Sequence, residues 1–434
     1  MEKSVWKDSI TLPRFNKLEG DKKTDVLIIG GGICGILCAY FLKQNGIDYI
    51  LAEGSKVLSG TSGNTTAKIT VQHGLIYNGL INKFGKEKAK MYLEANTDAL
   101  TSYKELCAGI ECNFEEKHSY VYSLTNRQKI EEEVNAANAL GICATFQEHT
   151  ELPFKIHGAV CFPGQAQFNP LKFISGIING LNIFENTFIN GLDCGKASSD
   201  SGTIKAKHIV VCTHFPFLNK HGSYFLKLYQ HRSYVSAFEN AQAINGMYVN
   251  ENLKGLSFRN YGDLLLVGGG SHRTGKHGSA WQHAEEFTKK HYPHAELKYR
   301  WASQDCMSLD SIPYIGKYSK HTGNLYVATG FNKWGMTSSM VAAKIICDMI
   351  KGNQNDYAEV FSPQRSIIKP QLLINSIETA TNLIYPTVKR CPHLGCALKW
   401  NKYEHTWDCP CHGSRFTKDG KLIDNPATGN ANIE

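Results

Sequence analysis

The sequence predicts an α/β fold that also contains an antiparallel β-sheet and ends in a short metal-binding domain. Three observations lead to this fold class. A strand, a glycine turn, a helix and a second strand follow one another over residues 25–53. Aromatic and alternating segments fill residues 226–270, as is typical of antiparallel strands. Cysteines and histidines crowd into residues 391–412, where they predict a metal site.

Composition and charge exclude several classes of protein. The chain has 434 residues, of which 42% are hydrophobic, and its 20 Phe, 20 Tyr and 6 Trp provide ample material for a core. This composition excludes disorder for most of the chain, and the length predicts about two to three domains. The net charge of +8 is spread along the chain without a basic block, so we expect no nucleic-acid partner.

The sequence shows neither a membrane span nor a targeting segment. Its longest apolar run, residues 26–42, is interrupted by four glycines and is shorter than the roughly twenty residues of a transmembrane helix. Residues 1–23 are a polar, charged N-terminal arm without the apolar stretch of a signal peptide. We therefore expect a cytoplasmic protein.

The first regular elements form a β-α-β unit. Residues 25–29 are a dense apolar strand, residues 33–44 are a helix that Asn45-Gly46 closes, and residues 48–52 are a second strand. The turn between the first strand and the helix fits G-x-G-x-x-G, with Gly30, Gly32 and Gly35 at the three glycine positions. The second strand ends at Glu53.

This glycine turn predicts a dinucleotide site. Gly30 allows the tight turn, Gly32 lets the backbone approach a pyrophosphate, and Gly35 permits close packing of helix on strand. The helix N-terminus offers unpaired N–H groups and a positive dipole to the phosphates. Glu53 is placed to accept the ribose hydroxyls of an adenosine. The fingerprint by itself does not separate FAD from NAD.

The remaining elements follow in order along the chain. Helices are predicted at residues 86–107, 128–140 and 170–178, and strands at residues 120–124, 182–184 and 209–212. The antiparallel sheet is predicted within residues 226–270. Polar runs at residues 351–356 and 362–366 indicate a linker before the C-terminal domain.

A second strand, glycine loop and helix stand near the end of the α/β region. The strand near residues 325–329 leads into a loop at Gly330, and a long helix runs over residues 337–350. In a flavoprotein such a loop brings a helix N-terminus to the isoalloxazine, where its dipole stabilises negative charge on the reduced ring. An NAD-binding domain does not need this returning element, so the pattern favours FAD.

On these motifs the chain resembles the D-amino-acid oxidase-like (DAO) family of FAD-dependent oxidoreductases over residues 25–350. The resemblance implies a Rossmann-like FAD-binding domain that an antiparallel β-sheet substrate domain interrupts. Within residues 24–350 it assigns the FAD-binding parts to residues 24–90, 155–215 and 300–350, and the substrate sheet to residues 91–154 and 216–299.

The resemblance also implies which side chains contact the cofactor. They lie in the segment after the β-α-β unit and in the second glycine loop, and they are Thr61, Thr65, Thr66, Ala67, Gly330, Lys333, Trp334, Gly335, Met336 and Thr337. Asp310 and Gly316 are expected close to the cofactor as well. Because Lys333 stands where some relatives could carry a covalent attachment cysteine, we expect non-covalent FAD.

The C-terminal cluster reads C-x-H, fifteen residues, C-x-x-H. Two thiolates and two imidazoles at this spacing can bind metal in two ways. A tetrahedral zinc site is one, although zinc modules usually pair C-x-x-C with H-x-x-x-H. The tight C-x-H step suits the other, a pair of adjacent irons.

The cluster and its surroundings resemble a Rieske [2Fe–2S] domain. The resemblance implies that Cys391 and Cys409 hold one iron and that His393 and His412 hold the other. It also implies a disulfide that joins the two cluster loops through Cys396 and Cys411. Trp400-Asn401, Trp407-Asp408 and residues 413–416 belong to the same resemblance.

This sequence departs from the Rieske pattern in two ways. The linker covers residues 351–384 and the domain residues 385–434. The segment from Gln371 to Lys389 is short and partly helix-like, so we expect the basal β-subdomain that normally precedes the first ligand loop to be missing. We therefore expect the domain to dock on the flavin domain for stability. High-potential relatives carry a tyrosine where Phe416 stands, while Ser414 keeps one hydroxyl donor, so we expect a reduction potential below the top of the Rieske range.

Candidate substrate residues lie in segments that could face a flavin pocket. Arg232 could clamp a substrate carboxylate in a bidentate pair, but it could equally be a surface or inter-strand arginine. Tyr234 and Tyr77 are further candidates. His73 is a candidate base, although a packed polar residue is the more ordinary interpretation.

The predicted function is that of an FAD-dependent oxidoreductase. The flavin would oxidise a C–N bond of a small-molecule amine or amino acid, and the cluster would pass the electrons singly to an external acceptor, either a ferredoxin-like protein or a quinone. Two alternatives stay open at this point. Electrons could flow from the cluster to the flavin, or the chain could be a non-catalytic electron-transfer or redox-sensing protein.

Overall fold

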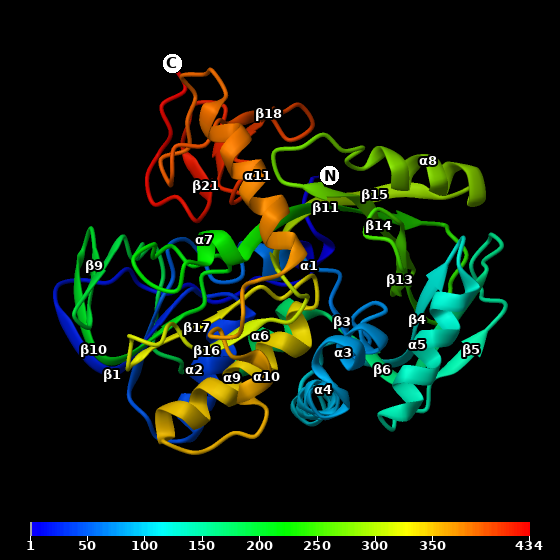
Figure 1. Ribbon diagram of the computed structural model, residues 1–434, viewed down its shortest axis with the longest axis horizontal. Coiled ribbons are helices and arrows are strands. Elements are labelled where there is room, and N and C mark those ends of the chain that lie inside the picture. Colours follow the sequence, from blue (N-terminus) through cyan, green and yellow to red (C-terminus); the bar gives the residue numbers. More distant parts are fainter. Residues whose placement is uncertain (1) are drawn as a thin grey trace.

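The computed structural model describes residues 2–434, which form three β-sheets and the helices packed around them (Figure 1). The predicted α/β part and the small C-terminal β domain are both confirmed. Within the described residues, no helix combines the length and the apolar character needed to cross a membrane.

The first sheet is the α/β part and has eight strands. Five of them, from β17 to β7, run parallel, and β16 pairs antiparallel at one edge. Across the sheet the strands are β16 (Tyr314–Lys317), β17 (Leu325–Thr329), β10 (Gly202–Val211), β1 (Lys22–Ile29), β2 (Tyr49–Ala52) and β7 (Ile183–Phe184), with β9 (Lys196–Ser199) and β8 (Gly191–Asp193) attached to β10. Because parallel strands end at the same edge, the loops after β1, β2, β10 and β17 meet there.

Helices cover this sheet and complete the main core. The helix α2 (Ile33–Gln44) follows β1, α9 (Gly335–Lys351) follows β17, and the two pack against each other. Most positions of α2 are buried, because the sheet lies on one side of it and α9 on another. Around them lie α3 (Tyr77–Phe84), α4 (Lys86–Cys107), α6 (Pro170–Ile177) and α10 (Ala358–Phe361).

The second sheet has nine strands and curls beside the first. In order they are β15 (Glu296–Ser308), β11 (Leu228–Glu239), β14 (Leu264–Arg273), β13 (Ser257–Tyr261), β12 (Met247–Asn250), β4 (Glu115–Ser123), β6 (Gly158–Gln167) and β3 (Lys68–Ile69), with β5 (Thr145–Gln147) paired to β6. The sheet is mixed, because β12 and β4 run parallel. The predicted boundaries at residues 155 and 300 cut across it, since β6 and most of β15 belong to this sheet.

The helices α5 (Arg127–Ala139) and α8 (Gln282–His291) pack on the second sheet. The N-terminal arm is also part of the folded body. It contains α1 (Val5–Ser9), whose Trp6 is fully buried and donates from Nε1 to the carbonyl of Thr65 at 2.7 Å. The arm therefore supports the segment that the sequence assigns to the flavin.

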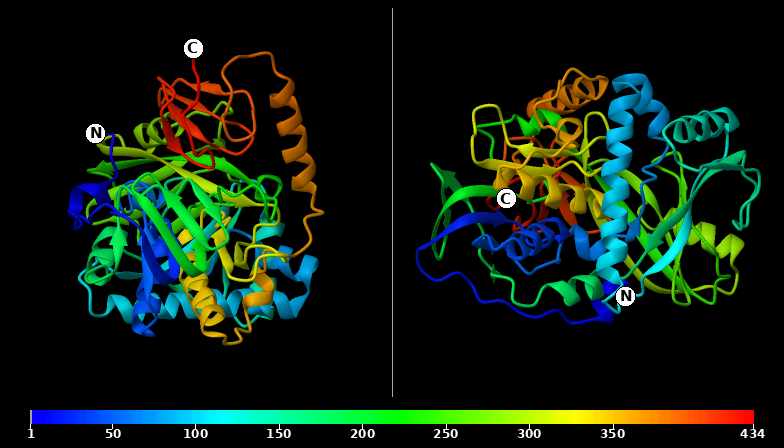
Figure 2. Two further views of the ribbon diagram at one scale, coloured as in Figure 1. Left: turned by 90° about the vertical axis from the view of Figure 1, so that its left-hand side faces the viewer. Right: turned by 90° about the horizontal axis from the view of Figure 1, so that it is seen from below.

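The third sheet forms the C-terminal domain. Its antiparallel strands are β18 (Lys399–Asn401), β19 (Thr406–Asp408), β20 (Arg415–Thr417) and β21 (Leu422–Asp424). The segment predicted as a linker contains a helix, α11 (Pro370–Ile384), which runs along the outside of the molecule toward this domain (Figure 2, left). The short helix α7 (Tyr224–Lys227) lies between α11 and the start of β11.

Candidate functional site

A cavity of about 1070 Å³ opens where the parallel strands of the first sheet end. The loops after β1, β2, β10 and β17 line it, together with residues of β11 and β15 from the second sheet. The last loop of the C-terminal domain, including Asp424 and Asn425, also lines it. Such a crevice at the carboxyl ends of parallel strands is where α/β folds bind their ligands.

The glycine turn after β1 has the geometry that the sequence predicts. Gly30 has φ +110°, and a Cβ atom there would lie 2.7 Å from the carbonyl oxygen of Cys212. A Cβ at Gly35 would lie 1.9 Å from the carbonyl oxygen of Gly30, so α2 could not pack so closely on β1 with another residue. Gly32 lines the cavity, and its nearest neighbour is the hydroxyl of Ser62.

Glu53 is fixed at the end of β2, on the cavity wall. Its carboxylate accepts hydrogen bonds from the backbone N–H groups of Gly31 at 2.7 Å and Ser55 at 2.8 Å. Burial raises the pKa of Glu53, although these two donors favour the ionised form. The side chain is thus locked beside the glycine turn, where an adenosine ribose is expected.

The second glycine loop lies on another wall of the cavity. Gly330 and Lys333 have positive φ angles of 69° and 74°, which turn the chain from β17 into α9. The first residues of α9 line the cavity, and its N-cap residue, Trp334, makes no side-chain capping bond. The N–H groups of this helix start are therefore available to a ligand in the cavity.

The structure brings most of the predicted cofactor residues together. Those that line the cavity are Gly30, Gly32, Glu53, Thr61, Thr65, Thr66, Gly330, Lys333, Trp334, Gly335 and Met336. Gly35, Ala67 and Thr337 lie behind the wall. The hydroxyl of Thr337 instead contacts the carbonyl of Thr70 at 3.2 Å and Nε2 of His73 at 3.0 Å.

Asp310 and Gly316 are not placed beside the cavity. Asp310 makes a bidentate ion pair with Arg365, with both N···O distances 2.8 Å. Gly316 lies in the edge strand β16, against Met349 and Pro363. Neither is among the residues that line the cavity, and the expectation that they lie close to the cofactor stays a prediction.

The cavity fits FAD on its own geometry. A dinucleotide needs a glycine turn without side chains, an acid at the end of the next strand and room for a flavin, and all three surround one space. The buried Nε2 atom of His214, on the cavity wall, has no hydrogen-bond partner among the described residues. Such an orphaned group is expected where a ligand completes the site.

His73 lies on the cavity wall but cannot act as a free base. Its Nδ1 lies 2.6 Å from the hydroxyl of Tyr92, and its Nε2 lies 2.9 Å from the carbonyl of Thr70. Burial lowers the pKa of His73 to about 3, so the ring is neutral. The ring also stacks on Trp334 at a centroid distance of 5.1 Å, which makes it a support for the second glycine loop. Tyr77, the neighbouring candidate, is fully buried and donates to the carbonyl of Val71.

Arg232 is not available as a substrate clamp. Its guanidinium forms a bidentate pair with Glu404 of the C-terminal domain, with Nε 3.0 Å from Oε1 and Nη2 in contact with Oε2. The hydroxyl of Tyr234 donates to the same carboxylate at 2.9 Å. Both residues therefore hold the two domains together, and the substrate roles predicted for them are not supported.

Sequence reasoning missed a buried lysine on the cavity wall. Lys68, in β3, is 9% exposed, and its Nζ has one long contact, 3.4 Å to the hydroxyl of Thr66. Burial lowers the pKa of Lys68 to about 7, and the positive charge of Arg259 adds to the effect. The sequence did offer a signal for Lys68, because this residue stands two positions after Thr66, in the segment expected to lie against the flavin.

The predicted metal-ligand residues of the C-terminal domain converge in the same way. The rings of His393 and His412 lie 4.8 Å apart, and the Nδ1 atom of each is buried without a hydrogen-bond partner. The thiols of Cys391 and Cys409 are buried and belong to one core cluster. Two thiols and two unpartnered imidazole nitrogens fit a [2Fe–2S] cluster of the Rieske type.

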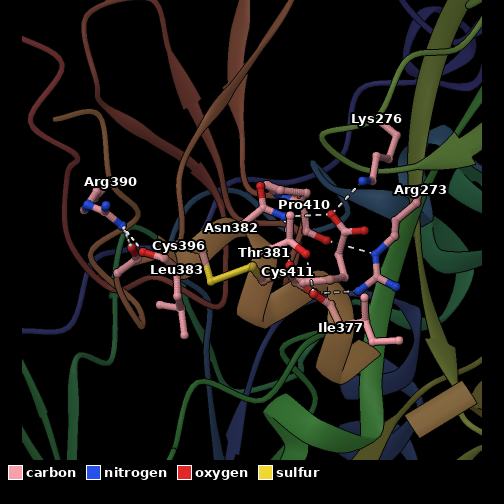
Figure 3. The surroundings of a disulfide bond; sticks show 12 residues. Arg273, Lys276, Ile377, Thr381, Asn382, Leu383, Arg390, Cys396, Pro410 and Cys411 are labelled. Atoms are coloured by element: carbon pink, nitrogen blue, oxygen red, sulfur yellow. Dashed lines mark hydrogen bonds and ion pairs between the residues drawn. A yellow bond between two sulfur atoms is a disulfide. The ribbon is translucent and has the colours of Figure 1, made fainter. Parts of the chain in front are cut away.

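The two loops that carry these ligands are joined by a disulfide between Cys396 and Cys411 (Figure 3). The hydroxyl of Ser414 accepts from the N–H of Ala427 at 2.9 Å, and Phe416 is fully buried among the cluster cysteines. Figure 3 also shows Arg273 of the second sheet reaching the loop at Pro410 and Cys411.

The flavin domain holds the second cluster loop by its backbone. Four successive carbonyls, from Pro410 to Gly413, each accept a hydrogen bond from it. Arg273 donates to the carbonyls of Pro410 at 2.9 Å and Cys411 at 3.1 Å. Gln230 donates to the carbonyl of His412 at 2.7 Å, and Gln304 to that of Gly413 at 2.8 Å. The C-terminal domain is thus docked on the flavin domain, as expected for a domain without its basal subdomain.

One loop connects the cavity with the cluster site. Cys212, Thr213 and His214, directly after β10, line the cavity. The next residue, Phe215, is fully buried, and its ring lies 6.4 Å from that of His393 and 6.1 Å from that of His412. This one loop therefore lies between the cavity and the two cluster histidines.

Comparison with known proteins agrees with both sites. The family model for FAD dependent oxidoreductase (DAO) matches residues 25–349, and the model for the Rieske [2Fe-2S] domain matches residues 353–433. The Rieske 2Fe-2S iron-sulfur protein YhfW of Bacillus subtilis is 34% identical over 98% of this chain and 96% of its own length. Iron-sulfur subunit 3 of the cytochrome b6-f complex of Nostoc is 48% identical, over 9% of this chain and 22% of that protein.

Solved structures share the fold of the flavin part. L-proline dehydrogenase from P. horikoshii matches 80% of this chain and 98% of its own, with a TM-score of 0.67 and 15% identity. Glycine oxidase from Geobacillus kaustophilus matches 80% and 99%, with a TM-score of 0.67 and 17% identity. The chain belongs to the DAO family of FAD-dependent oxidoreductases and carries a C-terminal Rieske [2Fe–2S] domain.

Proposed function

We propose that this protein oxidises a C–N bond of an amine or amino acid and passes the electrons through its Rieske cluster to an external acceptor, a ferredoxin-like protein or a quinone. The loop from Cys212 to Phe215 carries the proposal, because it touches the flavin cavity at one end and both cluster histidines at the other. The substrate class is supported by the likeness of the fold to a proline dehydrogenase and a glycine oxidase.

Bound FAD would supply a two-electron acceptor that can release its electrons one at a time, which suits a one-electron partner. The residues of this chain prepare the cavity for such chemistry. Gly30 and Gly32 leave room for the pyrophosphate, and Glu53 is placed to accept hydrogen bonds from the ribose hydroxyls. The start of α9 points the positive end of its dipole at the cavity. Trp334, held by His73, fixes the loop that leads into that helix.

Lys68 is the proton acceptor in this proposal. An amine must lose its ammonium proton before a hydride can leave the adjacent carbon, and a base near neutrality performs this step best. With a pKa of about 7, the Lys68 amine is half neutral near pH 7. Lys333 is less suited to this task, because its Nζ is already paired with Asp305 at 3.0 Å and with Ser233.

The electrons leave through the C-terminal domain. His412 is buried beneath the flavin domain, whereas His393 is partly exposed and its Nε2 lies 2.8 Å from the side chain of Asn219. The cluster site is thus covered on the cavity side and reachable from outside at His393. That asymmetry suits a carrier that takes electrons from the cavity and gives them to a partner.

The test is anaerobic mixing of the holoprotein with a library of amines and amino acids, followed at the flavin and cluster absorption bands. A substrate should bleach the flavin first and the cluster afterward. Cys391→Ser, which removes a cluster ligand, should retain flavin reduction but lose rapid turnover with a one-electron acceptor. If no compound bleaches the flavin, or if the reduced flavin never reduces the cluster, the proposal is wrong.

A further inference from the structure

The helix α11 presents an apolar face to solvent. Leu373 is 66% exposed, Ile377 58% and Ile384 82%, and the residues that flank the helix, Ile368 and Val388, are also exposed. Side chains at spacings of four and seven positions lie on one side of a helix. The apolar face therefore forms a continuous stripe along α11, which we call the α11 stripe (Leu373, Ile374, Ile377 and Ile384).

The opposite face of α11 is polar and buried. Asn375 and Asn382 are each 4% exposed. Asn375 accepts from Arg273 at 2.9 Å, and the carbonyl of Asn382 accepts from the N–H of Ala397 at 2.9 Å. This amphipathic helix is inverted relative to the usual arrangement, in which the apolar side faces the core. Packing within the chain therefore does not explain the stripe.

Basic residues flank α11 in the sequence, at both ends of the helix. Residues 366–400 contain four of them, Lys369, Lys389, Arg390 and Lys399, and one acid, Glu378. Lys369 directly precedes the helix. Arg390 donates to the carbonyls of Leu383 and Tyr385 at its end, and Lys399 lies over the ring of Tyr385. Glu378 is neutralised by Lys276 at 2.7 Å.

Charge and composition together favour a lipid surface as the occupant. An apolar stripe flanked by cations is the pattern of helices that lie in the plane of an anionic membrane interface. A second copy of the chain would bring the same cations face to face, because a two-fold contact uses one patch on both subunits. Protein interfaces are enriched in aromatic residues and Met, whereas the stripe is aliphatic.

We propose that α11 docks this protein on a membrane surface that contains anionic phospholipids. The helix would lie parallel to the membrane with Leu373, Ile377 and Ile384 among the acyl chains and the flanking cations at the headgroups. The C-x-H loop follows the C-terminal end of α11 in the chain, and Arg390 donates to the carbonyls of both Leu383 in α11 and Gly395 in that loop. Membrane docking does not depend on the substrate or on the direction of electron flow.

The test is flotation of the holoprotein with vesicles of equal parts phosphatidylglycerol and phosphatidylcholine, without substrate. The protein should float with these vesicles and stay behind with vesicles of phosphatidylcholine alone. Leu373→Glu should weaken binding at least about tenfold, because burying a leucine is worth more than the roughly 1.4 kcal/mol of a tenfold change. Leu124→Glu is the matched control, since Leu124 is an exposed leucine away from α11.

Retained flavin and cluster absorbance shows that each variant is folded, and Ile377→Ser replaces Leu373→Glu if the latter loses them. Light scattering over a range of concentrations tests the rival occupant. Absence of binding to the anionic vesicles, equal binding by Leu373→Glu and Leu124→Glu, or a stable dimer that Leu373→Glu dissociates would each overturn the proposal.

Discussion

Lys68 shows how burial can prepare a side chain for chemistry. The amine is taken out of water at the cavity wall, and this lowers its pKa from 10.5 to about 7. Between these two pH values the folded chain binds fewer protons than the unfolded chain. The contribution of Lys68 to the free energy of unfolding therefore rises as the pH rises across that window.

We predict that Lys68 sets the acid limb of the pH profile. With the best substrate, kcat/KM should rise about tenfold per pH unit below pH 7 and level off above it, because the neutral amine is the active form. Lys68→Met should abolish this limb while flavin binding, measured by absorbance, is retained. An unchanged limb in Lys68→Met would assign the titration to another group.

Phe416 and Ser414 test the tuning of the cluster. Phe416 is buried among the cluster cysteines, so Phe416→Tyr should add a hydroxyl donor that favours the reduced cluster. A hydrogen bond of about 1 kcal/mol corresponds to roughly 40 mV for one electron. We expect Phe416→Tyr to raise the potential by about that amount and Ser414→Ala to lower it, as measured by protein-film voltammetry. Unchanged potentials in both variants would mean that these side chains point away from the sulfurs.

The glycine turn is the clearest element to test. Gly32→Val should abolish FAD binding, because the new side chain would occupy the cavity where the backbone is expected to meet the pyrophosphate. Gly79→Val, in α3, is the matched control, because nothing lies within 4 Å of the position where its Cβ would stand. The measurement is the flavin content per chain after purification. Full flavin content in Gly32→Val would show that the glycine turn is not part of the FAD site.

Local patterns in the sequence predict the elements that depend on neighbours in the chain. The β-α-β unit at Gly30, the helix α9 and the cluster spacing around Cys391 are of this kind, and the cavity collects most of the residues assigned to it. Pairing between strands that are distant in the chain leaves no local pattern, so the sequence did not predict the parallel pairing of β12 with β4. The partner of Arg232 was hidden for the same reason, because Glu404 lies 172 residues away.

The two domains are joined by a buried ionic network. Glu404 lies between Arg232 and Arg415 and also accepts from Tyr234. Burial would raise the pKa of Glu404, but the two guanidinium groups outweigh it and hold the pKa at about 2. The carboxylate therefore stays ionised, and its contribution to stability is complete above about pH 4.5 and is lost as the pH falls toward 2.

We predict that Glu404→Gln loosens the docking of the C-terminal domain. Leaving the buried Arg232 without its carboxylate should cost about 3–5 kcal/mol, whereas Arg415 keeps its pairs with Asp408 and Asp424. Amide hydrogen exchange in β11 and β18–β20 should accelerate accordingly. Glu239→Gln is the matched control, because Glu239 lies on β11, the strand of Arg232, in an exposed pair with Lys298. This substitution should change the exchange rates little. Equal exchange in the two variants would contradict this account of the junction.

The four carbonyls from Pro410 to Gly413 also set an order of maturation. Arg273, Gln230 and Gln304 recognise the path of the main chain and not its side chains. We expect that path to become stable when the loop closes around its metal, since small metal-binding domains gain folding free energy from their metal. A newly made chain should thus acquire its iron before its two domains dock. The flavin domain would then bind the C-terminal domain stably only when the second cluster loop has its metal-bound path.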